Sequence, residues 1–405
     1  MDAVTAEARF MEDLLARLVE APTVLGNEEP GQALMQEAFR ALGLDAVDVP
    51  LDPDALRAHP AASPFSWDVS GKTNVVATWP SSGNGGRSLI LNGHIDVVPA
   101  GSESLWRTAP FRAHRDGDWL YGRGSGDMKA GLAAIVGAVR GLQRLGLAPD
   151  APVQLQSVVE EECTGNGALQ CVLSCPAAEA AVIPEPFPGA ITISQVGVLW
   201  FRVTITGVPA HVGLAGAGFN AIEAAYPIIE ALRGLEAELN EEPPAPYDGF
   251  EQPIKLNVGT IQGGDWPSTV ASDCSLAFRI ALYPGRRIEE LRELVEATVT
   301  AAANGSRAEV VYDGFACEGS EVPADAPLVQ TLGTAYERVA GTAAHRTATT
   351  ATTDASAFVG AGIPAVCLGP HAENIHGIDE RVSIPSMIET AQVLGLFIRD
   401  WCGLS

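Results

Sequence analysis

The sequence predicts an α/β protein in which a mixed, mostly parallel sheet flanked by helices is interrupted by an inserted α+β unit. Two patterns predict this. In the first third of the chain, apolar strand-like runs alternate with segments whose apolar residues recur three and four positions apart. Between residues 197 and 316 the pattern becomes β-α-β-β-α-β, a ferredoxin-like two-layer unit, and the α/β pattern then resumes. We therefore expect one discontinuous domain of residues 1–196 and 317–405 and an inserted domain of residues 197–316.

The elements of the large domain follow from the spacing of apolar residues. Helices are expected at 4–20, 29–43, Met128–Leu145, Ala168–Cys175, 326–339 and 385–402. Strands are expected at Thr73–Trp79, Ser88–His94, Leu120–Tyr121, Pro152–Val159, Ala180–Pro184 and 364–368. Strands that alternate with helices favour a mostly parallel sheet covered on both faces.

The inserted unit has its own strands and helices. Its strands are expected at Val198–Thr206, Ile254–Ile261, Cys274–Leu282 and Ala308–Tyr312, and its helices at Asn220–Leu239 and Arg287–Ala303. A loop rich in proline and acidic residues, 241–252, separates the first helix from the second strand.

Composition narrows the classes of function. The chain has 405 residues, of which 47% are hydrophobic, so it can bury sizeable cores. Its net charge of −25 disfavours binding to nucleic acid or to anionic membranes. No run approaches 18 apolar residues, and the amino terminus lacks the basic start of a signal peptide. Seven cysteines without a CxxC pair favour reduced thiols, so the cytoplasm is the expected location.

His94 and Asp96 close the apolar segment SLILNGHIDVVP. They lie two positions apart at a strand end, so their side chains leave the same face. The carboxyl ends of strands are the usual ligand position in open α/β sheets. A histidine ligand needs an acceptor on its second ring nitrogen, so Asp96 is better placed beside His94 than as a ligand. A local polar contact between the two side chains is the alternative.

Asp127 lies in a glycine-rich loop, YGRGSGDMKAG, at the start of a predicted helix. No Gly-Lys-Ser/Thr follows, so a phosphate-binding loop is not indicated. A carboxylate in a loop that has few other side chains, because so many of its residues are glycine, suits a metal ion. An ordinary helix N-cap is the alternative.

Acidic residues and histidines follow further strands. Glu160, Glu161 and Glu162 close one strand, Glu185 follows another, and the segment GPHAENIHGIDERVSI places His371 and His376 beyond a third. A cluster of like charges is usually a solvated strand end. A metal ion changes this, because one carboxylate can bind it while a neighbour takes a proton from its water. Each feature is weak alone, but together they predict a metal site.

Taken in order, the segments HIDVVP, GRGSGDMKAG, EEECTGNGA, Pro-Glu-Pro, Ala-His-Val-Gly and a late histidine resemble the co-catalytic zinc amidohydrolases and metallopeptidases. That family includes aminoacylase, acetylornithine deacetylase, succinyl-diaminopimelate desuccinylase and glutamate carboxypeptidase. The resemblance implies a zinc-exopeptidase-like domain for the outer segments. It also implies that the inserted unit is a lid or dimerisation domain, through which a homodimer would form.

The resemblance also implies the metal ligands. One Zn²⁺ would be bound by His94, Asp127 and Glu185, and Asp127 would bridge to a second, held also by Glu162 and His376. Co²⁺ and Mn²⁺ are the alternative metals.

Residues beside these ligands receive supporting roles from the same resemblance. Glu161 would be the general base, and Asp96 would orient His94. Glu160 stands where the family more often has Asp, and it is not a ligand position. His371 matches no family position, so we interpret it as a loop residue.

The substrate side of the site is expected in the lid and in one late loop. By resemblance, His211 in GVPAHVG would stabilise the oxyanion, often in the partner subunit's site, and a plain surface histidine is the alternative. Asn257 and Arg279 lie on adjacent lid strands, and Arg279 would grip a substrate carboxylate unless it makes a lid salt bridge. Thr352 and Thr353, in ATTDASAF, resemble the family's substrate loop.

The function expected from this resemblance is removal of an acyl group from an N-acyl amino acid or a similar small amide, as in acetylornithine deacetylase. Water activated at the metal pair would attack the amide without a covalent intermediate. A dipeptidase or carboxypeptidase of the same family is the nearest alternative. A metal-free scaffold that keeps the fold is the alternative outside enzymes.

Overall fold

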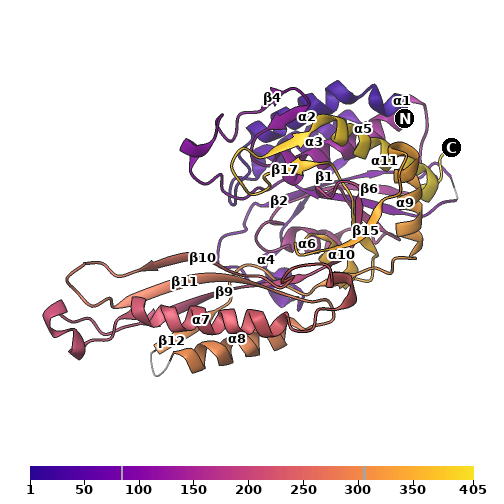
Figure 1. Cartoon of the computed structure of the whole chain (residues 1–405). Coiled ribbons are helices and arrows are strands. Elements are labelled where there is room, and N and C mark those ends of the chain that lie inside the picture. Colours follow the sequence, from indigo (N-terminus) through magenta and orange to yellow (C-terminus); the bar gives the residue numbers. More distant parts are fainter. Residues whose placement is uncertain (84, 304–306) are drawn as a thin grey trace.

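The structure of the chain is a computed structural model that describes residues 1–83, 85–303 and 307–405. Figure 1 shows a larger part that holds both termini and a smaller, elongated part that extends from it. The larger part is built on a nine-stranded sheet and the smaller part on a separate five-stranded sheet. This arrangement confirms the predicted α/β class with an α+β unit.

The large sheet is mixed, and its parallel strands lie in the middle. Its strands are β1 (Ala46–Pro50), β2 (Thr73–Trp79), β3 (Leu89–His94), β6 (Val153–Val158), β7 (Ala181–Ile183), β8 (Ala190–Gln195), β14 (Ser320–Glu321), β15 (His345–Thr349) and β16 (Ala365–Cys367). The order is β1-β2-β6-β3-β7-β16-β8-β14, and β15 pairs with β8. Parallel pairs join β6, β3, β7 and β16, while the pairs β1–β2, β2–β6, β16–β8 and β8–β14 are antiparallel. The carboxyl ends of the central strands therefore meet at one edge, where ligands bind in open α/β sheets.

Helices cover both faces of this sheet. They are α1 (Asp2–Thr5), α2 (Ala8–Glu20), α3 (Glu29–Ala41), α4 (Pro53–Ala58), α5 (Ala130–Arg144), α6 (Asn166–Ser174), α9 (Pro327–Ala340), α10 (Ala355–Gly360) and α11 (Ile384–Cys402). Successive residues of β3 point to opposite faces. Leu91 joins the core formed with α2, α3, α5, α9 and α11, and Ile90 packs with Ala168 of α6 and Phe358 of α10.

The inserted part has the predicted β-α-β-β-α-β order. Its elements are β9 (Gly197–Thr206), α7 (Ala221–Leu239), β10 (Leu256–Gly263), β11 (Asp273–Leu282), α8 (Ile288–Ala302), β12 (Arg307–Val311) and β13 (Ala316–Cys317). The strands pair antiparallel in the order β10-β11-β9-β12, with β13 also on β9. Leu276 and Phe278 of β11 are buried in a core with α7 and α8. In Figure 1 both helices lie on the face of this sheet that points away from the larger part.

Several short elements were not predicted. They are β1, α4, β8, β13, β14, β15 and α10, and three strands of a small sheet, β17 (Ala372–Glu373), β18 (Arg381–Ser383) and β4 (His114–Asp116). These three form the order β17-β18-β5-β4 with β5 (Trp119–Tyr121), which was expected at Leu120–Tyr121. The strands of two or three residues among them are too short to show alternation of apolar and polar residues, so sequence periodicity does not reveal them.

The prediction of one continuous helix at 4–20 is wrong, because the structure has two helices there. α1 ends at Thr5 and α2 begins at Ala8. Glu7, between them, is buried, and its carboxylate pairs with Arg140 of α5 at 2.6 Å. Among the helices of the described residues, none is both long and apolar enough to cross a membrane.

Candidate metal centre

Six side chains that offer metal-ligand atoms converge at the carboxyl edge of the large sheet. They form three overlapping groups, and the ligand atoms of each group lie within 4.8 Å of one another. The groups are His94, Asp127 and Glu185; Asp127, Glu162 and His376; and His94, Glu161 and Glu162. The first two groups contain the ligand sets expected from the resemblance. The central parallel strands explain the convergence, since β3 ends at His94, and Glu161 and Glu185 follow β6 and β7.

Asp127 lies between the first two groups and faces each with a different oxygen. Its Oδ1 is 3.1 Å from Nε2 of His94, and its Oδ2 is 3.2 Å from Nε2 of His376. Although burial opposes it, hydrogen bonds from both histidines lower the pKa of Asp127. A carboxylate that presents one oxygen to each of two ligand groups is suited to bridge two cations.

His94 is fixed by the backbone beside it. The ring is fully buried, and its Nδ1 lies 2.9 Å from the backbone oxygen of Asp96. A proton on Nδ1 donated to that oxygen leaves the lone pair of Nε2 free to bind a metal. Nε2 points toward Asp127 and lies 3.6 Å from Oε1 of Glu185.

The carboxylate of Asp96 is hydrogen-bonded to the backbone of Glu161 and Glu162 and not to the ring of His94. It accepts hydrogen bonds from the backbone N–H groups of Glu161, at 3.2 Å, and Glu162, at 3.0 Å. Its Oδ1 is 3.8 Å from Nδ1 of His94, beyond a hydrogen bond. Asp96 therefore positions both sides of the site: His94 through its carbonyl, and the glutamate pair through its carboxylate.

The site carries more buried negative charge than its histidines can balance. Burial, together with the charges of neighbouring carboxylates and against the opposing effect of His94, raises the pKa of Glu161 and of Glu185 well above the usual range. Burial alone would lower the pKa of His376, but its contacts with Asp127 and Glu162 raise it to about 10. Divalent cations would relieve this imbalance, and imidazole with carboxylate oxygen is a donor set that suits zinc, manganese and cobalt. The residues present therefore fit a metal pair.

Glu160 points away from the ligand cluster. Its backbone adopts a left-handed conformation, with φ of 64°. Its carboxylate accepts hydrogen bonds from Nε1 of Trp67 at 2.7 Å, Nζ of Lys72 at 2.9 Å and Oγ1 of Thr164 at 2.9 Å. This is the geometry of a supporting residue, in keeping with its interpretation as a non-ligand position.

Glu380 is a buried part of the site that sequence reasoning missed. Its carboxylate accepts hydrogen bonds from the backbone N–H groups of Gly124, Gly126 and Asp127, and it pairs with the buried guanidinium of Arg123. The available signal was an acidic residue four positions after His376. That signal is weak, because the donors lie more than 250 residues away in sequence.

Among the described residues, no hydrogen bond or ion pair joins His211, Asn257 or Arg279 of the inserted part to this cluster. His211 is exposed, and its Nδ1 accepts a hydrogen bond from Gly213 N–H. Asn257 of β10 lies opposite Arg279 of β11 in the antiparallel register. Arg279 is half-buried, which lowers its pKa, and it donates to the carbonyl of Thr350 at 3.4 Å. No carboxylate of the described residues lies within ion-pair distance of Arg279, so the structure does not show the alternative lid salt bridge.

The late loop is tied to the strand that leads into the lid. Thr352 donates to the carbonyl of Val196 at 2.8 Å, and Thr353 to Oε1 of Gln195 at 2.7 Å. The structure thus places both hydroxyls on neighbouring protein atoms rather than on the ligand cluster. His371, interpreted as a loop residue, is exposed and stacks edge-on against Trp119.

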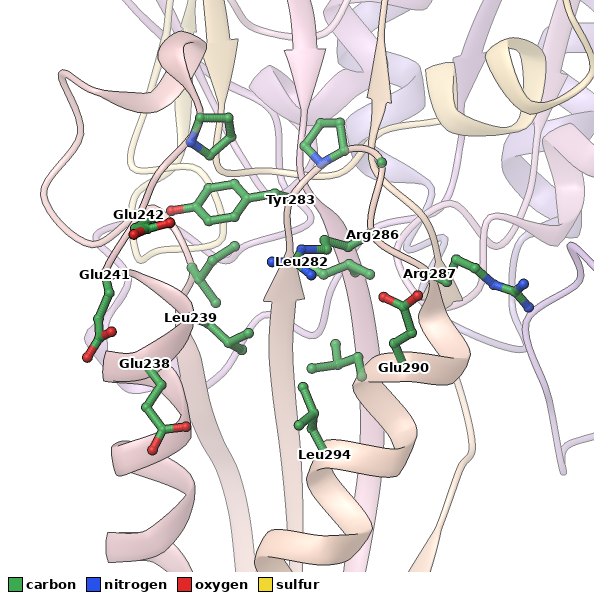
Figure 2. A pocket seen from close by; sticks show the side chains of 15 residues that line it. Glu238, Leu239, Glu241, Glu242, Leu282, Tyr283, Arg286, Arg287, Glu290 and Leu294 are labelled. Atoms are coloured by element: carbon green, nitrogen blue, oxygen red, sulfur yellow. The ribbon is translucent and has the colours of Figure 1, made fainter.

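Two cavities lie outside the ligand cluster. One has a volume of about 480 Å³ and lies on the inserted part, between the end of α7 and the start of α8. Figure 2 shows Leu239, Tyr283 and Leu294 in its wall. The other, of 610 Å³, lies at the junction of the two parts and is lined by Thr352, Asp354 and the segment 315–320, among others. No residue of the ligand cluster lines either cavity.

Comparison with known proteins agrees with this geometry. The profile of peptidase family M20/M25/M40 matches residues 90–400. An N-formyl-4-amino-5-aminomethyl-2-methylpyrimidine deformylase of Halalkalibacterium halodurans is 28% identical over 366 residues, which cover 84% of this chain and 85% of the relative. The acetylornithine deacetylase of Edwardsiella ictaluri is 30% identical over 335 residues, 82% and 84% of the two chains. In fold, the chain resembles the di-peptidase Dug1p of Saccharomyces cerevisiae, with a TM-score of 0.82, 15% identity, and coverage of 99% of this chain and 97% of that one.

Proposed function

Since this chain belongs to peptidase family M20/M25/M40, we propose that it is a metal-dependent hydrolase that removes an acyl group from an N-acyl amino acid or a similar small amide. The observation that carries the proposal is Asp127, whose two oxygens face His94 and His376 separately within two ligand groups. The deformylase and the deacetylase similar to this chain support the choice of a deacylase within the family.

The proposed cofactor is a pair of divalent cations, zinc in the first place and cobalt or manganese as alternatives. His94, Asp127 and Glu185 would hold one, and Asp127, Glu162 and His376 the other. When bound, such a pair lowers the pKa of water and polarises the carbonyl of the amide.

Glu161 is the proposed general base. It is buried beside the ligand groups, with Oε2 3.8 Å from Nε2 of His94, and its backbone is held by Asp96. From this position its carboxylate would accept a proton from the attacking water and deliver it to the leaving nitrogen. Burial keeps the carboxylate poised to take that proton, because it disfavours the charged form.

The lid would complete the site from a second copy of the chain. His211 makes no contact with the ligand cluster of its own chain within the described ranges, so a role on the oxyanion requires a partner. Several large apolar side chains of the inserted part are exposed: Val212 and Leu214, next to His211 in sequence, and also Ile261 and Trp266. We infer that this surface forms a homodimer interface that brings His211 to the partner's site. Asn257 and Arg279 would bind the substrate carboxylate, with the Thr352–Thr353 loop alongside.

A dipeptidase or carboxypeptidase of the same family is the second candidate, and Arg279 fits it as well as it fits a deacylase. Its half-buried guanidinium has no carboxylate within ion-pair distance among the described residues, so it would suit a substrate with a free carboxylate, whether an acyl amino acid or a peptide. We propose the cytoplasm as the location, since the seven cysteines are free.

A substrate panel tests the proposal. Purified protein is assayed with N-acetyl, N-succinyl and N-formyl amino acids and with dipeptides, and its metal content is measured by elemental analysis. We expect cleavage of acyl amino acids and about two divalent ions per chain. Cleavage of dipeptides alone would favour the peptidase. Less than about one tightly held ion per chain would favour the metal-free scaffold.

A further inference from the structure

We propose that Glu380 is a positioning residue for one of the two proposed metal sites. This site, here called the outer site, is formed by Asp127, Glu162 and His376, and the inner site is formed by His94, Asp127 and Glu185. The inference rests on the proposed two-metal function. It starts from the contacts of one buried carboxylate that joins two loops, each of which carries a ligand.

The first loop is the glycine-rich turn that presents Asp127. Oε1 of Glu380 accepts hydrogen bonds from the N–H groups of Gly126, at 3.0 Å, and Asp127, at 3.1 Å. Oε2 accepts from the N–H of Gly124, at 3.1 Å, and from Arg123. Three backbone N–H groups of this turn, those of Gly124, Gly126 and Asp127, thus converge on a single carboxylate. They fix the backbone from which the bridging side chain projects.

The second loop connects β17 to β18 and carries His376. Its residues Asn374, His376 and Asp379 all have left-handed backbones, with φ of 56°, 60° and 56°. The His376 side chain is half exposed, so little packing holds it. Glu380 ends this loop and is anchored on both sides: its carbonyl accepts from Gly122 N–H, and Asp379 beside it accepts from Arg107 N–H at 2.8 Å. The position of His376 therefore depends on where Glu380 is held.

This arrangement affects the two sites unequally. The inner site has two further ligands, His94 at the end of β3 and Glu185 two residues after β7, and both are buried. Among the described residues, no hydrogen bond or ion pair joins either of them to Glu380. The outer site depends on Glu380 for two of its three ligands, Asp127 through the turn and His376 through the loop. Loss of the carboxylate should weaken the outer site and spare most of the inner one.

Glu380→Gln tests this with a side chain of nearly the same shape. Both oxygens of Glu380 accept hydrogen bonds from N–H groups. In either orientation of the glutamine amide, its NH₂ group therefore faces N–H groups, and donor meets donor. The full-length chain is stripped of metal with a chelator and titrated with cobalt(II), and the visible absorption of the bound ion is followed. We expect the second equivalent to bind about 10- to 100-fold more weakly than in the unaltered chain, while the first binds as before.

Glu373→Gln is the matched control. Glu373 lies on the same hairpin and pairs with Arg381, but it accepts no hydrogen bond from the glycine-rich turn. Its substitution should leave both binding steps unchanged. A purely structural Glu380 would lower the unfolding temperature of the variant without separating the two steps.

Each outcome decides a different point. Equal weakening of both steps, or no change in either, would overturn the assignment. Failure of the unaltered chain to bind two cobalt ions would overturn the proposed function instead. If Glu380→Gln does not fold, as judged by circular dichroism, Glu380→Asp decides by the same criteria, because it keeps the charge but is one methylene too short to reach all donors.

Discussion

Asp354 is a buried carboxylate whose ionisation should destabilise the fold, and its replacement by asparagine should show this. Both carboxylate oxygens lack a hydrogen-bond partner in the described structure, and the residue is 2% exposed. Burial, opposed by His94 and reinforced by the charge of Asp96, raises its pKa to about 7. An aspartate in an unfolded chain has a pKa of about 3.9.

The sign and size of the effect follow from proton linkage. Between about pH 4 and pH 7 the folded chain binds more protons at this site than the unfolded chain, so the free energy of unfolding falls as pH rises. The slope is about 1.4 kcal/mol per pH unit, and a displacement of about three units gives a loss of order 4 kcal/mol above pH 7. Asparagine does not titrate, so Asp354→Asn should lack this contribution.

Urea unfolding of chelator-treated protein, from about pH 5 to about pH 8, measures the effect as a change in the unfolding free energy. The difference between Asp354→Asn and the unaltered chain should grow in favour of the variant as pH rises to 7, and then level off. Asp325→Asn is the control, since Asp325 is exposed. If the Asp354→Asn curve runs parallel to that of the unaltered chain across this range, Asp354 does not titrate abnormally and the reasoning is refuted.

Three further predictions concern catalysis. Glu161→Gln should keep its metal by elemental analysis but lose about 10²- to 10⁴-fold in kcat, and near-normal turnover would remove Glu161 from the role of base. His211→Ala should lower kcat without changing metal content, and a mixture with Glu161→Gln chains should regain activity through mixed dimers; an unchanged rate for His211→Ala would make it a surface residue. Arg279→Ala should raise KM for substrates with a free carboxylate more than for their esters, and equal KM values in the variant and the unaltered chain would assign Arg279 to lid structure.

Part of the ligand cluster could be expected from the sequence because parallel strands bring their carboxyl ends together. His94, Glu161 and Glu185 each follow an apolar strand, so the fold that places the strands side by side also places these residues together. The bridging geometry of Asp127 came from family resemblance, since a glycine-rich loop has no periodicity that predicts where its side chains point.

Residues that act over long sequence distances were not predictable in this way. Glu380 looks like an ordinary acidic residue before a short strand, and its importance appears only when the glycine-rich turn packs against it. The same holds for Lys72, whose ammonium joins Glu28 at 2.6 Å and Glu160 at 2.9 Å inside the protein. Each of these pairs depends on tertiary packing that brings together segments without a shared local pattern.

The inserted part, which we call the lid, is joined to the large sheet through two neighbouring strands. β8 and β14 are antiparallel neighbours, and Gln195 lies opposite Ser320 in their register. Seen from the large sheet alone, the whole lid is the connection of a β-hairpin, which in other proteins is closed by a few residues. The inserted part therefore leaves and re-enters the large sheet at two neighbouring strands. A chain in which a tight turn joins Gln195 to Ser320 would retain all six residues of the ligand cluster and lack His211, Asn257 and Arg279.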